Sequence, residues 1–172
     1  MPADLTALTA ACTRWLLAAY PPPSGALSRA LAEAQARQAT VLAASLCYPT
    51  SMDVELLHLL APSGSHRLDW LTGSEPHPDD PDTAWRTWVD ETVVSWAACL
   101  LAEPALATRA RQAMAATEHH AETGSLQRLT SPGARDSEAA ALLRHPDLLE
   151  DIAGLHRSQL LQRLNVQGAT PS

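Results

Sequence analysis

Apolar residues recur every three or four positions along most of the chain, which is the spacing of one face of an α-helix. In residues 4–20 this pattern is carried by Leu5, Leu8, Cys12, Trp15 and Leu16. No segment alternates apolar and polar residues in the manner of a half-buried strand. The pattern therefore predicts an all-α protein.

Prolines and glycines divide this pattern into separate helices, because proline cannot continue a helix but is favoured in its first turn. The expected helices cover residues 4–20, 25–48, 51–60, 83–101, 104–123, 136–144 and 146–166. We expect them to form a single-domain bundle of about six or seven helices over residues 1–166. Residues 167–172 are expected to be a frayed tail.

The longest stretch without helical periodicity lies between Gly64 and Thr83 and contains three prolines, two glycines and five carboxylates. A connection of about twenty residues is longer than most, and such loops are usually functional or mobile. We therefore expect one long irregular loop at 62–83. The same loop is a candidate boundary between an N-terminal hairpin and a C-terminal bundle.

Three tryptophans lie in the helix expected at 83–101, which Asp82 can cap. At about 100° per residue, Trp85, Trp88 and Trp96 fall on one face. Large aromatic side chains on one stripe are typical of a core, and this helix, apolar on two sides, is expected to be central. The alternative is that the three indoles form a surface that binds a partner or an apolar ligand.

The last expected helix contains Gly154, which costs up to about 1 kcal/mol relative to alanine inside a helix. A hinge or a close approach of another helix would explain a glycine at this position.

Composition narrows the range of partners. The net charge of the 172-residue chain is −7, and its twelve cationic residues are all arginine and are scattered. Binding to a phosphate backbone needs clustered cations, so we do not expect a nucleic-acid partner. The absence of lysine and phenylalanine indicates the codon bias of a G+C-rich bacterial genome.

The three cysteines, Cys12, Cys47 and Cys99, lie far apart in apolar segments and lack the spacing of a disulfide framework or a zinc site. We expect buried free thiols, and from them a bacterial cytoplasmic location. The first ten residues have no basic region followed by a long apolar one, so a signal peptide is not expected. No apolar run is long enough for a membrane span.

A cluster of histidines and glutamates is the first candidate for chemistry. Within the segment 117–125, Glu118 and Glu122 are one helical turn apart, and His119 and Glu122 have i,i+3 spacing. Imidazole and carboxylate groups in this arrangement suit a divalent metal, Fe, Zn or Mn. The preferred interpretation is a solvated helix end, where histidine is favoured by the helix dipole.

A second segment could complete such a site. Glu55 and His58 have the Glu-x-x-His spacing that helical di-iron proteins use on two of their helices. The sequence contains no second copy, and four leucines surround the pair between residues 56 and 60. We therefore interpret both as polar positions on a short amphipathic helix.

No motif assembles a nucleophile, a base and an anion-binding loop. The sequence favours a non-catalytic interaction module, such as an adaptor, assembly factor or accessory subunit, which binds another protein or a second copy of itself. No cofactor is expected on that interpretation. The alternatives are a small metal-dependent enzyme or metal-binding protein that uses the His/Glu cluster, and a helical pocket lined by tryptophan for an apolar ligand.

Overall fold

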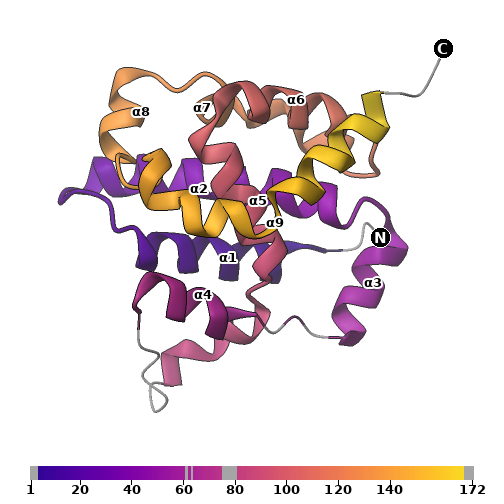
Figure 1. The fold of residues 1–172 in the computed structure, drawn as a ribbon, viewed down its shortest axis with the longest axis horizontal. Coiled ribbons are helices and arrows are strands. Elements are labelled where there is room, and N and C mark those ends of the chain that lie inside the picture. Colours follow the sequence, from indigo (N-terminus) through magenta and orange to yellow (C-terminus); the bar gives the residue numbers. More distant parts are fainter. Residues whose placement is uncertain (1–3, 61, 63, 75–80, 169–172) are drawn as a thin grey trace.

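A computed structural model describes residues 4–60, 62, 64–74 and 81–168 of the chain (Figure 1). These residues form helices joined by short connections and contain no strand, so the all-α prediction is confirmed. The elements are α1 (Thr6–Ala19), α2 (Ala26–Cys47), α3 (Ser51–Leu60), α4 (Ser65–Thr72), η1 (Pro81–Trp88), α5 (Glu91–Ala102), α6 (Pro104–Met114), η2 (His120–Ser125), α7 (Gln127–Thr130), α8 (Ala134–Ala139) and α9 (Pro146–Gly168).

Helix α5 is the centre of the fold. All its residues from Val93 to Leu101 are buried, and it packs against α2 on one side and α9 on the other. Helix α1 packs along α2, and the two run in opposite directions across the molecule (Figure 1). A helix that is apolar on two sides thus lies between two others, as expected, because each apolar side needs its own cover.

The expected single helix over 83–101 is wrong in one respect, because the chain is broken at Val89 and Asp90. Residues before the break form the 3₁₀ helix η1, and residues after it form α5. Oδ1 of Asp90 accepts hydrogen bonds from the backbone N–H groups of Thr92 and Val93 and so caps α5. The cap of the buried helix is therefore Asp90 and not Asp82, which lies inside η1.

Two other expectations need correction. The stretch expected to be irregular contains α4, which ends at Gly73 with a left-handed φ of 69°. Helix α6 ends at Met114 rather than near residue 123. Beyond it the backbone N–H of Glu118 bonds to the carbonyl oxygen of Pro49, so the chain leaves the helix to meet the connection between α2 and α3.

Helix α9 begins at Pro146, as expected, and is kinked at His156, where φ is −132°. The kink is held by α5: Oγ of Ser95 accepts from the His156 N–H and donates to the Ala153 carbonyl oxygen. The indole N–H of Trp96 donates to the carbonyl oxygen of His156. A methyl group built on Gly154 would meet no atom within 4 Å, so close approach of another helix does not explain this glycine.

Helix α9 continues to Gly168, two residues beyond the expected domain limit at 166. Residues 169–172 lie outside the described part, so a frayed tail stays a prediction. Among the described residues, no helix combines the length and the apolar character that crossing a bilayer requires.

Candidate functional site

Glu118, the first residue of the His/Glu cluster, contacts the N-terminus of α3. Its Oε2 accepts a hydrogen bond of 2.9 Å from the Ser51 backbone N–H and another from the Ser51 hydroxyl. These two bonds, the hydroxyl's first, lower the pKa of Glu118 below its ordinary value. The carboxylate therefore acts as a cap for α3, supplied by a residue 67 positions away.

His119 contacts the connection between α2 and α3. Its Nε2 lies 2.8 Å from the carbonyl oxygen of Tyr48, and its backbone N–H donates to the Thr117 hydroxyl. Glu122 is exposed and lies in η2. The cluster thus has one carboxylate and one imidazole that hold α3 in place, and a second carboxylate directed to solvent.

The structure brings the segments 51–58 and 118–122 together, but through Ser51 and Glu118 rather than through the Glu-x-x-His pair. Glu55 is exposed, and the His58 ring lies edge-on to the Trp88 ring with centroids 5.9 Å apart. Within the part of the chain that the structure describes, no group of three or more His, Cys, Asp or Glu side chains is arranged to hold a metal. A divalent-metal site stays a prediction.

The tryptophans do not form one stripe, because the break at Val89 and Asp90 puts them on two elements. Trp96 is buried in α5, while Trp85 and Trp88 of η1 are partly buried against the core. The Arg86 guanidinium lies 5.3 Å from the Trp85 ring centroid. A role for these indoles in partner or ligand binding stays a prediction, and the most exposed apolar side chains lie elsewhere.

Helix α3 carries four of the nine exposed large hydrophobic side chains found among the described residues. Met52 is 71% exposed, Leu56 50%, and Leu59 and Leu60 80% each. At about 100° per residue they occupy one continuous outward face, which we call the α3 strip. Only Val54 and Leu57 of α3 are buried, and the helix stands at the edge of the molecule (Figure 1).

A cavity of about 320 Å³, the α3 groove, opens beside the strip. It is lined by Cys47, Tyr48, Asp53, Leu56, Leu57, Leu60, Pro62 and Asp90. Leu56 and Leu60 belong to both features, so the strip and the groove form one continuous apolar surface with two carboxylates inside it. Exposed apolar patches, and apolar pockets that contain a few polar groups, commonly mark protein-interaction or ligand-binding sites.

The ionisable groups in the groove are paired or protonated. The Tyr48 hydroxyl donates a 2.5 Å hydrogen bond to Oδ2 of Asp90, and burial together with this bond raises the pKa of Tyr48. Burial also raises the pKa of the Cys47 thiol well above its ordinary value. Both groups are therefore protonated at neutral pH.

Local sequence explains how α3 forms in this position. Pro49 ends the preceding helix, and Thr50 and Asp53 make reciprocal hydrogen bonds across the first turn: the Asp53 N–H donates to Thr50 Oγ1, and the Thr50 N–H to Asp53 Oδ2. This is a capping box, which fixes where the helix begins. The sequence pattern predicts the helix but not the exposure of its leucines, although the four leucines between residues 56 and 60 exceed what one buried face needs.

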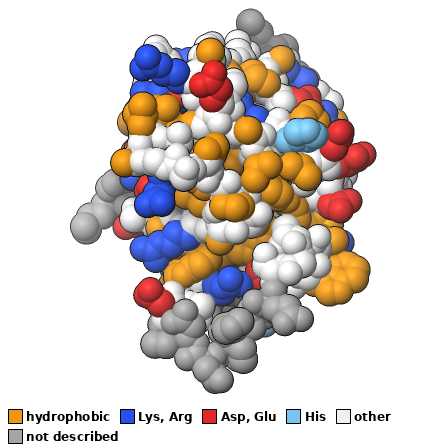
Figure 2. All heavy atoms as spheres, turned by 90° about the vertical axis from the view of Figure 1, so that its left-hand side faces the viewer, with side chains coloured by type: hydrophobic (Ala, Val, Ile, Leu, Met, Phe, Trp, Pro, Cys, Tyr) orange, Lys and Arg blue, Asp and Glu red, His pale blue; other side chains and the backbone are white. Residues whose placement is uncertain are grey.

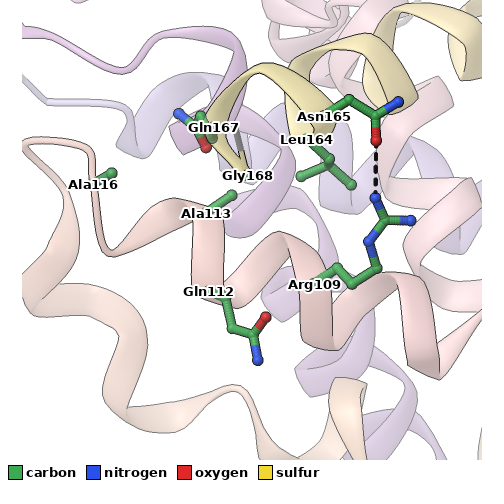
Figure 3. A pocket seen from close by; sticks show the side chains of 8 residues that line it. All are labelled: Arg109, Gln112, Ala113, Ala116, Leu164, Asn165, Gln167 and Gly168. Carbon is green, nitrogen blue, oxygen red and sulfur yellow. Dashed lines mark hydrogen bonds between the residues drawn. The ribbon is translucent and has the colours of Figure 1, made fainter. Parts of the chain in front are cut away.

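Two other surface features differ from the α3 strip and groove. A cavity of about 420 Å³ between α6 and α9 is lined by Leu164 together with small and polar residues, and Arg109 donates to Asn165 Oδ1 at 3.2 Å across it (Figure 3). The end of the molecule on the left of Figure 1 has hydrophobic side chains with arginines and carboxylates around them (Figure 2). Met52, Leu59 and Leu60 of the α3 strip are more exposed than Leu27, at 63%, or Leu148, at 47%.

Comparison of the chain with protein-family models, with curated proteins and with solved structures gives no match.

Proposed function

We propose that this protein is a non-catalytic interaction module, an adaptor, assembly factor or accessory subunit of a bacterial cytoplasm, and that it binds another protein through the α3 strip. The observation that carries this proposal is the exposure of Met52, Leu56, Leu59 and Leu60 on one helix face. Apolar side chains gathered on an exposed helix face are a common means of docking a second protein.

The alternatives named from the sequence have less support. The residues of the metal alternative are separated, with His119 engaged by a backbone carbonyl oxygen and His58 by Trp88. The indoles of the ligand alternative line neither the α3 groove nor the α6/α9 cavity. The α3 strip, by contrast, is left exposed by all the residues that the structure describes.

Site-specific photo-crosslinking in the native host tests the proposal. A photoreactive residue at Leu59 is expected to trap one defined protein, identifiable by mass spectrometry. The adduct should disappear when Leu56 and Leu60 are both replaced by aspartate. A matched control places the crosslinker at Leu27, an exposed leucine near the start of α2. The proposal would be contradicted if the crosslinkers at Leu59 and Leu27 trapped the same mixture of proteins, or if the crosslinker at Leu59 trapped no protein.

A further inference from the structure

Charged residues on α3 lie only at the two borders of the strip. At about 100° per residue, Glu55 is adjacent to Leu59 on one border, and Asp53 is adjacent to Leu60 on the other. Residues 51–60 contain no arginine. His58, whose ring lies edge-on to the Trp88 ring, is the remaining ionisable group of the helix. The apolar face is therefore bordered by negative charge on both sides.

We propose that the α3 strip and groove bind an amphipathic helix of another protein whose apolar face is bordered by arginine or lysine. This inference rests on the proposed function and specifies the partner. The strip residues have the spacing i, i+4, i+7 and i+8, which matches the way one helix meets another in a groove. Opposite charges along the borders fix orientation and speed association.

The charge pattern disfavours the other occupants of an apolar face. In a symmetric dimer both copies present the same patch, so carboxylates would face carboxylates along each border. Anionic membranes and nucleic acids meet the same repulsion from Asp53 and Glu55 and from a chain with net charge −7. A cationic border on the partner is the one arrangement that turns these charges into attraction.

The groove gives one cationic side chain a defined place. Its cavity of about 320 Å³ has walls formed by Leu56, Leu57 and Leu60, on which the stem of a lysine or arginine packs. Asp90 is already used by the α5 backbone and the Tyr48 hydroxyl. Asp53 receives hydrogen bonds from Thr50 at Oδ2, so its Oδ1 is the acceptor best placed for the incoming cation.

Three stapled helical peptides test this inference on the full chain by fluorescence anisotropy. The first has leucines at i, i+4, i+7 and i+8 bordered by arginines, the second has glutamates in place of the arginines, and the third has the arginines with the leucines scrambled. We expect the first to bind at least about tenfold more tightly than either of the others, with an affinity that falls as salt rises.

Variants locate the binding. Asp53→Asn with Glu55→Gln keeps an oxygen at position 53 for the Thr50 cap, and we expect it to weaken the first peptide by about tenfold and to remove most of the salt dependence. Glu55→Gln alone changes an exposed side chain and tests the same point without altering a cap. Glu138→Gln, on the exposed face of α8, is the matched control and should change nothing.

The outcomes separate this inference from the proposed function. Equal affinity for the arginine and glutamate peptides, or no effect of the charge variants, overturns the cationic helix but leaves the docking surface. Concentration-dependent dimerisation lost on Leu59→Asp overturns it in favour of a second copy. If none of the peptides binds, the inference of a cationic helix fails. The proposed docking function fails only if the photoreactive residue at Leu59 also traps no protein.

Discussion

Ser95 is a fully buried polar side chain whose two hydrogen bonds join α5 to the kink in α9. Ser95→Ala leaves a backbone N–H and a carbonyl oxygen of α9 without these partners, and should lower the free energy of unfolding by about 1–3 kcal/mol. Urea denaturation measures the change. The exposed Ser158 of α9 gives the control, Ser158→Ala, which should be nearly neutral. Equal stability of both variants would show that the kink does not depend on Ser95.

Gly154 is a residue whose replacement should stabilise the protein. Its φ lies outside the left-handed region, and an added methyl group would meet nothing within 4 Å. Alanine also restricts the unfolded chain, so Gly154→Ala should raise the free energy of unfolding by about 0.5–1 kcal/mol and raise Tm. Thermal unfolding measures this. A lower Tm would mean that the kink two residues away needs the freedom of glycine.

At the scale of elements, α3 depends on a cap that titrates. Hydrogen bonds from the Ser51 hydroxyl and then from its backbone N–H lower the pKa of Glu118 in the folded protein below its ordinary value near 4.5. The stabilisation of α3 by this cap is therefore complete above pH 4.5, and it is lost as the pH falls through the lowered pKa of Glu118. The Ser51 amide resonance in NMR should therefore follow a titration below 4.5, and exchange of the first α3 amides should accelerate there. Glu118→Gln should abolish this titration, whereas Glu122→Gln should not.

The ends of a helix can be predicted from sequence when local residues determine them, and not when contacts with distant segments do. The bounds of α3 and the start of α9 follow from local signals, a proline with a capping box in one case and a proline in the first turn in the other. Periodicity does not reveal the break before α5, because it continues through Trp88 and Val89. The Asp90 cap is a local signal that could have shown it, but the Tyr48 bond that holds Asp90 comes from tertiary structure.

The candidate site shows why the burial of a helix face is harder to predict from sequence than the helix itself. A run of leucines is read as core, yet whether a helix face is covered depends on which other helices reach it. Helix α5 is covered on both sides by α2 and α9, whereas the outer face of α3 has no cover among the described residues. Of the three tryptophans expected in the core, Trp96 is buried, whereas Trp85 and Trp88 are only partly buried.

If the α3 strip is a docking surface, folding and docking must depend on different residues of the same helix. Leu57 is buried, so Leu57→Ala should lower the free energy of unfolding by about 2–5 kcal/mol. Leu59→Asp with Leu60→Asp alters side chains that are 80% exposed, and should change it by no more than about 0.5 kcal/mol for each residue. The double variant should nevertheless bind less of the apolar dye ANS and none of the arginine-bordered peptide. Loss of stability in the double variant comparable to that of Leu57→Ala would instead show that the strip is needed for folding, and its exposure would then no longer support docking.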